Sequence, residues 1–96
     1  MTGTVYTGAY YNGIVLSNAT LQNPATIAAS GYIGNTGTSH NGDAIFGAVG
    51  TAWTVVNEGT IVSNGTIGLS YGVDLRSGGA VVNEATGSIT GQAGGI

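Results

Sequence analysis

Two carboxylates, those of Glu58 and Glu84, have the spacing that best suits hydrolytic chemistry. Each directly follows a Val-Val-Asn triplet, at residues 55–57 and 81–83. If the two strands stack, the carboxylates would lie about 5 Å apart, near the separation of the acid pair in a retaining glycosidase. Polysaccharide-cleaving enzymes also need a long cleft with aromatic and basic side chains, which a short stack offers poorly. We therefore expect two solvated, mildly repelling carboxylates, and a carbohydrate-active enzyme fragment is kept as an alternative.

Two other groups contain residue types that are found in hydrolase active sites. The G-x-S-x-G pattern at 68–72 matches the nucleophile elbow of hydrolases, but the elbow needs a following helix and a later His. Here we expect a strand to follow, and the only His, His40, comes earlier. Ser39, His40 and Asp43 are the residue types of a triad, but they crowd into a polar segment, 35–43, that we predict to be an outward loop. With no Cys and a lone His, we predict no catalytic residue, no metal site and no cofactor.

Charge is scarce, which limits the classes of partner. The charged residues are Asp43, Glu58, Asp74, Arg76 and Glu84. With a net charge of −3 and a single basic residue, the chain lacks the cation cluster that replaces phosphate counterions in nucleic-acid binding. The same shortage argues against an anionic membrane surface. Asp74 and Arg76 stand two residues apart, so on a strand they would share a face and form a weak, exposed ion pair.

Membrane insertion is not expected either. The longest apolar stretch, residues 44–56, contains Gly and Thr and is too short to span a bilayer. No basic, apolar, small-residue signal sequence opens the chain.

A repeat of 28 residues organises the elements that would position these side chains. The marker Gly-x-Val/Ile occurs at residues 3–5, 31–33, 59–61 and 87–89. A Val-Val-Asn type of segment and an Ile-x-Leu type of segment accompany it, so each period holds three short strands. This pattern predicts an all-β chain folded as a parallel β-helix (β-solenoid) with about 28 residues per rung and roughly three and a half rungs.

The predicted rungs form a single β-solenoid segment over residues 1–96, with boundaries near 3–30, 31–58, 59–86 and a partial rung at 87–96. The rival interpretation is a set of antiparallel hairpins, because Asn12-Gly13, Asn41-Gly42 and Asn64-Gly65 are strong hairpin dipeptides. A hairpin protein has no reason to repeat every 28 residues, and the flanking segments are polar and uneven. We therefore favour the solenoid.

Alternation along the strands predicts which side chains form the core. The expected inward columns are Val5, Ile33, Ile61 and Ile89; Ile27, Val55 and Val81; and Ile14, Ile45 and Val73, with Ile96 continuing the third. Asn57 and Asn83 fall at strand corners, where stacked amides can bond to each other and to turn backbone. The outward column Thr4, Tyr32, Thr60 and Ser88 is too irregular to match an ice lattice well, so an ice-binding solenoid is a second alternative.

The C-terminal half carries a resemblance to a known family. The carriers are Gly72-Val-Asp-Leu, Gly78-Gly-Ala-Val-Val-Asn, Gly87-Ser-Ile-Thr-Gly and Gly95-Ile96. These motifs resemble the passenger repeats of bacterial autotransporters and are similar to those of filamentous-haemagglutinin-like surface proteins. The match is good over about 44–96 and looser over 1–43. The resemblance implies a secreted stalk or adhesin, extracellular or at the bacterial cell surface, with activity in inserted loops that this chain lacks.

Neither end of the sequence has the pattern of a polar cap. Residues 3–5 already match a repeat strand, and Ile96 begins another. Exposed end rungs present unpaired backbone that can template strand addition, and few charges guard against it. The sequence therefore predicts a structural protein that stacks end to end with itself as a homo-oligomer or fibre, or with neighbouring repeats of a longer parent chain.

Overall fold

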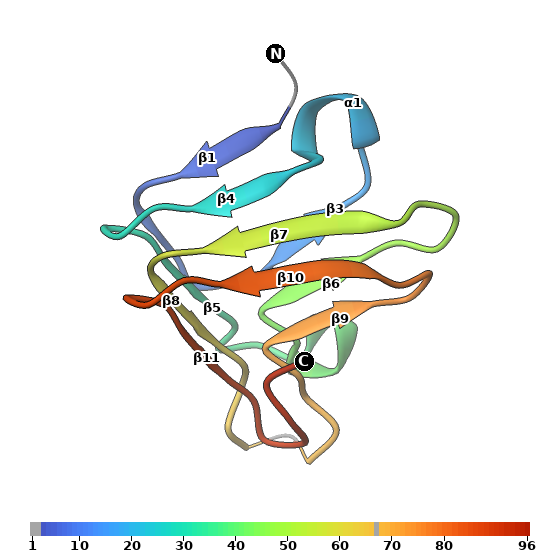
Figure 1. Cartoon of the computed structure of the whole chain (residues 1–96). Coiled ribbons are helices and arrows are strands. Elements are labelled where there is room, and N and C mark those ends of the chain that lie inside the picture. The colour runs from blue at the N-terminus through green and yellow to red at the C-terminus, as the bar shows by residue number, and fades with distance from the viewer. Residues whose placement is uncertain (1–2, 67) are drawn as a thin grey trace.

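The computed structural model describes residues 3–66 and 68–96 and is an all-β chain (Figure 1). Its strands belong to three parallel sheets. In the described residues, the helical elements are the single turn α1 (Ala19–Gln22) and a 3₁₀ turn, Ser39–Gly42.

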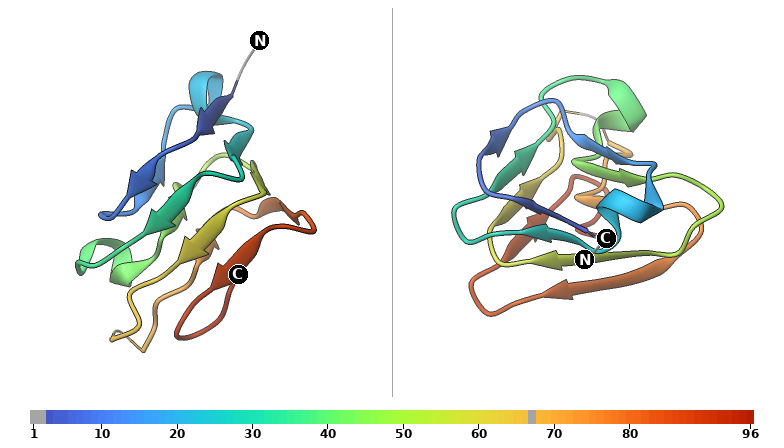
Figure 2. Two further views of the ribbon diagram at one scale, coloured as in Figure 1. Left: turned by 90° about the vertical axis from the view of Figure 1, so that its left-hand side faces the viewer. Right: turned by 90° about the horizontal axis from the view of Figure 1, so that it is seen from above.

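Each sheet collects its strands in the order of the sequence. The first sheet contains β1 (Thr4–Tyr6), β4 (Ala25–Ile27), β7 (Trp53–Asn57) and β10 (Gly79–Asn83). The second contains β2 (Ala9–Tyr10), β5 (Tyr32–Gly34), β8 (Thr60–Val62) and β11 (Ser88–Thr90). The third contains β3 (Ile14–Leu16), β6 (Ile45–Gly47) and β9 (Val73–Leu75). The chain visits the three sheets in turn and lays each new strand parallel to the previous one, which excludes the hairpin alternative (Figures 1 and 2).

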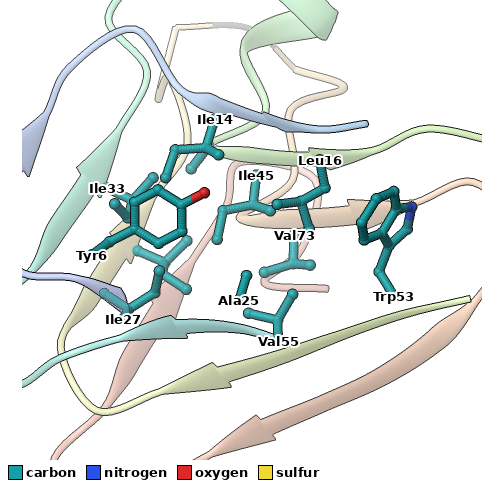
Figure 3. Close-up of a cluster of buried hydrophobic side chains, with 12 residues drawn as sticks. Tyr6, Ile14, Leu16, Ala25, Ile27, Ile33, Ile45, Trp53, Val55 and Val73 are labelled. Atoms are coloured by element: carbon teal, nitrogen blue, oxygen red, sulfur yellow. The ribbon is translucent and has the colours of Figure 1, made fainter. Parts of the chain in front are cut away.

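The three sheets lie on different sides of a shared interior (Figure 2). Alternation sets the faces: in β7, Trp53, Val55 and Asn57 are buried and the residues between them are half-buried. Buried side chains from all three sheets meet in one core (Figure 3). Its members are Tyr6, Ile14, Leu16, Ala25, Ile27, Ile33, Ala44, Ile45, Trp53, Val55, Ile61 and Val73.

The column of the second sheet differs from the prediction at Val5. Ile33, Ile61 and Ile89 are successive partners there, but Tyr10 stands before Ile33. Val5 lies in β1 of the first sheet with its side chain 58% exposed. The first return of the chain is shorter than the later ones, so the marker at residues 3–5 enters a different sheet although its sequence spacing is right. The inward assignment of Val5 was therefore wrong.

The column of the first sheet also differs from the prediction. Ile27 is fully buried, but its partner is Asn57, whereas Val55 pairs with Ala25 and with Val81. The different lengths of the corners explain this shift in register. Residues 28–31 separate Ile27 from β5, but only residues 58 and 59 separate Asn57 from β8. In the third sheet, the successive partners are Ile14, Ile45 and Val73, and all three are buried.

The N-terminal end of the sheets, formed by β1, β2 and β3, carries a polar cover. The Gln22 side chain at the end of α1 donates to the Val15 carbonyl and to the Tyr6 hydroxyl, each at 3.2 Å. Val15 is the middle residue of β3, whose flanking residues Ile14 and Leu16 bond toward β6, so the Val15 carbonyl belongs to the free edge. The polar cover therefore reaches the edge of β3, while β1 and β2 remain outermost in their sheets; α1 lies at this end of the sheets (Figure 1).

Candidate functional site

Most of the ionisable side chains lie together beside the third sheet. The sequence has one Arg, four Asp or Glu residues and one His. Of these six, His40, Asp74 and Arg76 lie beside Phe46, and Asp43 lies three residues before it. We call this group, His40, Asp43, Phe46, Asp74 and Arg76, the ionisable cluster. Because charged side chains repel or attract strongly only at close range, a cluster in so uncharged a chain is the first candidate for a site.

Strand register positions one half of the cluster. Phe46 on β6 and Asp74 on β9 are direct partners, so their side chains lie on the same face. Arg76 stands two residues after Asp74, and its Nε atom lies 3.3 Å from Asp74 Oδ2, which confirms the ion pair expected from the sequence. The Arg76 guanidinium also lies 5.2 Å from the centroid of the Phe46 ring, in a cation–π contact.

The 3₁₀ turn before β6 positions the other half. His40 and Asn41 adopt positive φ angles of 50° and 59°, which turn the chain sharply. The exposed His40 ring stacks on Phe46 with the centroids 4.3 Å apart. The Asn35 side-chain amide donates to the carbonyls of Ser39 and Asp43, at 3.1 and 2.9 Å, which folds this segment back on the body.

Asp43 is the most unusual member of the cluster. Its side chain belongs to the buried interior, with the residue only 2% exposed. Oδ1 accepts a hydrogen bond of 2.7 Å from the Tyr71 backbone N–H, but Oδ2 has no hydrogen-bond partner in the described part of the chain. The prediction of an outward loop over 35–43 was therefore wrong for Asp43 and for the buried Asn35. Asn35 finds its partners within the segment, whereas the partner of the Asp43 carboxylate is the backbone N–H of Tyr71 on the next layer.

Burial raises the pKa of the Asp43 carboxyl from its ordinary value of 3.8 to about 6. The Tyr71 N–H opposes this rise because it stabilises the carboxylate form. The neighbouring carboxylate of Asp74 raises the pKa of Asp43 further, and the Arg76 guanidinium lowers it. The site therefore places two acidic side chains close enough to interact, with one cation held by only one of them.

Neither motif with catalytic residue types assembles a reactive group. The Asp43 side chain bonds to Tyr71 while the His40 ring stacks on Phe46. The hydrogen bond between the His and the acid of the sequence triad is a backbone one, from the Asp43 N–H to the His40 carbonyl at 3.1 Å. In the G-x-S-x-G pattern, Ser70 is fully buried, lies 2.9 Å from the Ser63 hydroxyl and donates to the Asn64 carbonyl at 2.7 Å. A strand follows Ser70, whereas a nucleophile elbow exposes its Ser ahead of a helix.

Glu58 and Glu84 lie on successive layers of the first sheet. The backbone N–H of Glu84 donates to the Asn57 carbonyl at 2.9 Å, directly after the paired residues Asn57 and Asn83. Glu58 is half-buried and Glu84 is exposed. Neither residue lines either of the two cavities described below. The arrangement stacks the backbones at Glu58 and Glu84 on adjacent layers.

Asn57 and Asn83 occupy the corner that follows the first sheet. The fully buried Asn57 amide donates to Asn83 Oδ1 at 3.0 Å and to the carbonyls of Gly59 and Ser88, each at 3.2 Å. Its Oδ1 accepts from the Gly59 N–H at 3.1 Å. The Asn83 amide donates to the Gly87 carbonyl at 3.3 Å. The two side chains therefore satisfy the backbone of successive corners while bonding to each other.

A cavity of about 540 Å³ opens at the C-terminal end of the sheets, which is formed by β9, β10 and β11. Its lining residues are Tyr71, Val73, Asp74, Leu75, Gly78, Gly79, Val81 and Ile96. Ile96, expected in the third inward column, is 65% exposed. The cavity is therefore open and largely apolar, and Asp74 of the ionisable cluster stands at its border.

The outward face of the second sheet holds a smaller cavity of about 270 Å³, lined by Tyr32, Gly34, Asn35, Thr36, Val62, Ser63, Asn64, Gly65 and Thr66. Tyr32, Thr60 and Ser88 are register partners on this face. Thr4, expected in the same column, belongs to β1 of the first sheet. A shorter and chemically mixed column matches an ice lattice even less well.

Sequence reasoning missed the buried carboxyl of Asp43. One signal was available: Asp43 directly precedes the apolar segment Ala44-Ile45 and stands 28 residues before Tyr71, to which it bonds. The spacing of the repeat thus places these two residues on adjacent layers. Sequence alone does not say that the side chain turns inward.

A scan against protein-family models, a search of the curated proteins and a search of the solved structures each found no match. No helix in residues 3–66 and 68–96 has the length and apolar character needed to cross a membrane.

Proposed function

We propose that this chain is a structural segment of a parallel β-helix, and that it extends end to end by accepting further strands at its C-terminal end. The role that fits such a segment is the stalk or adhesin of a secreted bacterial surface protein. The assignment to the cell surface rests on the resemblance of about residues 44–96 to autotransporter and haemagglutinin-like repeats.

The observation that carries the proposal is incomplete burial in the last layer. Val55 and Ile61 are fully buried, but their partners in the last layer, Val81 and Ile89, are only partly buried. Complete burial of a Val or Ile side chain contributes roughly 1.5–3 kcal/mol. One more layer of strands over these side chains and over Leu75 would therefore be favourable.

Backbone chemistry supports the same direction. β10 and β11 are outermost in their sheets at this end, so one edge of each strand has unpaired N–H and C=O groups. The edge of β9 is partly covered by the end of the chain, because the Val73 N–H donates to the Gly95 carbonyl at 2.8 Å. β10 has the sequence Gly-Ala-Val-Val-Asn and carries no charge or proline that would discourage strand addition. At the opposite end, Gln22 blocks the edge of β3, while β1 and β2 remain outermost. A head-to-tail contact between two copies would therefore use the first and second sheets.

The test is particle mass across a concentration series of the 96-residue chain, by light scattering with negative-stain microscopy. We expect oligomers or filaments of the 9.4 kDa unit that grow with concentration. Ile96→Lys should suppress this growth because it puts a charge in the end cavity, where Ile96 is already 65% exposed. Val49→Lys is the matched control, since Val49 is 74% exposed and lies outside the cavity. A monodisperse wild-type monomer at high concentration would refute the proposal.

A further inference from the structure

We propose that the cavity of about 270 Å³ on the outward face of the second sheet binds one neutral pyranose unit of a saccharide. This volume lies just below the roughly 300–1,000 Å³ of sites for drug-sized ligands, so it suits a single small ring. The cavity shares no described lining residue with the cavity at the C-terminal end. The inference therefore goes beyond the structural role proposed above and does not depend on it.

An aromatic ring forms one wall of the cavity. Gly34 follows Tyr32 by two residues on β5, so both positions belong to the outward face of the sheet. A Cβ atom at Gly34 would lie 2.9 Å from Tyr32 Cε1, so the Tyr32 ring leans over this glycine. The Tyr11 ring packs against it with the centroids 5.7 Å apart. Tyr32 is still 37% exposed, which leaves aromatic surface open to pack against the C–H face of a pyranose ring.

The turn at residues 63–66 forms a second wall and is held in place by its own hydrogen bonds. The Asn64 side-chain amide donates to the Gly37 carbonyl at 2.7 Å, which links the turn to the preceding layer. Asn64 Oδ1 accepts from the backbone N–H and the hydroxyl of Thr66, at 2.9 and 2.7 Å. Val62, which precedes the turn, is the register partner of Gly34. Because these groups are already ordered, a ligand would not have to order them on binding.

Hydrogen-bonding groups remain available around the aromatic surface. The Asn64 amide has a second N–H besides the one already bonded. The hydroxyls of Thr36 and Thr66 each donate one bond, to the Tyr11 carbonyl and to Asn64 Oδ1, so their lone pairs can accept others. The Tyr32 hydroxyl makes no hydrogen bond with residues 3–66 or 68–96. The cavity therefore offers both donors and acceptors.

The lining selects the class of ligand. None of the described lining residues carries a charge at neutral pH, so nothing would offset the charge of a phosphate, sulfate or carboxylate group. A purely apolar ligand would leave the amide and hydroxyl groups without partners. A pyranose with equatorial hydroxyl groups matches the cavity better, because its hydroxyls donate and accept while its axial C–H groups present an apolar face. No acid pair lines the cavity, so we infer binding rather than cleavage.

The experiment is a titration of the wild-type chain with cellobiose, whose glucose units carry equatorial hydroxyl groups, followed by heteronuclear NMR. We expect saturable shifts of the backbone amides that line the cavity, those of Gly34, Gly65 and Thr66 among them. The Kd should be on the order of 1–10 mM, as suits a small open site. Mannitol, which has hydroxyl groups but no ring, is the control ligand and should give no saturable shift. The proposal is overturned if cellobiose gives none either, or if mannitol binds equally well.

A pair of tyrosine variants tests the aromatic wall. Tyr32→Thr removes the ring and keeps a strand-forming residue beside its register partner Thr60, and it should weaken cellobiose binding about tenfold. Tyr10→Thr is the matched control, because Tyr10 is 41% exposed but its ring contacts Tyr6 and does not line the cavity. Its Kd should equal that of the wild type. Unchanged binding in Tyr32→Thr would overturn the proposal.

A pair of glycine variants tests the geometry without removing a polar group. The methyl group of Gly34→Ala would displace the Tyr32 ring, so cellobiose binding should weaken about fivefold or more. The chain should still fold, because the displaced atoms lie at the end of an outward side chain. Gly8→Ala has open space around the added methyl and should bind as the wild type does. Ile96→Lys should also keep full binding, which separates a failure of this proposal from a failure of end-to-end stacking.

Discussion

The side-chain amide of Asn57 donates a 3.0 Å hydrogen bond to the side-chain oxygen of Asn83, its register partner on the next layer of the first sheet. The same column continues to Ile27 and Tyr6 on the preceding layers. An amide can donate and accept at once, so it can bond to an identical neighbour and to the corner backbone. The column therefore changes from apolar packing to hydrogen bonding within one sheet.

The Asn57 amide should carry far more stability than the Asn83 amide. Asn57→Ala removes, at a fully buried position, the donor to the carbonyls of Gly59 and Ser88 and the acceptor of the Gly59 N–H. We expect a loss of about 2–3 kcal/mol in the free energy of unfolding. Asn83→Ala should cost about 1 kcal/mol or less, because Asn83 is exposed and water can replace its bonds. Urea unfolding of both variants measures the difference, and equal losses would contradict this account of the corner.

Stability should fall as pH rises through the titration of Asp43. Below its ordinary pKa of 3.8, the folded and unfolded chains both hold the proton. Between 3.8 and about 6, only the folded chain keeps it, so the stabilising contribution is lost over that window and is absent above it. The loss is on the order of 3 kcal/mol. Thermal unfolding across that pH window measures it.

Asp43→Asn is the test of that assignment. Asn does not titrate, so the variant should lose the decline between pH 4 and 6 and should unfold at a higher temperature than the wild type at neutral pH. Glu84→Gln should keep the wild-type pH profile. If the stability of Asp43→Asn still declines between pH 4 and 6, the decline belongs to another ionisable group.

Val5 and Val55 should differ sharply although both are strand valines of the first sheet. Val55 is fully buried and Val5 is 58% exposed. Val55→Ala should cost about 1.5–3 kcal/mol through lost burial and a residual cavity, whereas Val5→Ala should change stability by about 0.5 kcal/mol or less. Chemical denaturation of the two variants checks the strand register. A large loss of stability in Val5→Ala would instead support an inward Val5 side chain.

Gln22 should restrain association at the N-terminal end. Gln22→Ala frees the Val15 carbonyl on the edge of β3, so sedimentation velocity should detect more self-association than in the wild type. Gln92→Ala is the control, because Gln92 bonds through its backbone N–H, which donates to the Ser63 hydroxyl and is kept in the variant. If the two variants self-associate to the same extent, Gln22 does not protect the edge of β3.

Much of the second sheet was predictable from the sequence because Gly-x-Ile at 31–33, 59–61 and 87–89 recurs at the spacing of its strands. A constant spacing keeps β-branched residues in register, and alternation then sends them inward. The parallel pairing of the strands followed from the same repeat. The Asp74–Arg76 ion pair was also predictable, since two residues on a strand share a face.

Tertiary structure alone decided the register of the first two layers and the position of Asp43. Corner length shifts a strand by whole residues, and nothing in a Gly-x-Val triplet states which sheet receives it, so Val5 and Ile27 were placed in the wrong columns. Asp43 is polar in a polar segment, yet it is buried. Asn35, in the same segment, bonds to its backbone carbonyl, and Tyr71, 28 residues later, donates to its side chain. A one-dimensional pattern records which residues alternate, but burial of a charge depends on partners that only the folded chain brings together.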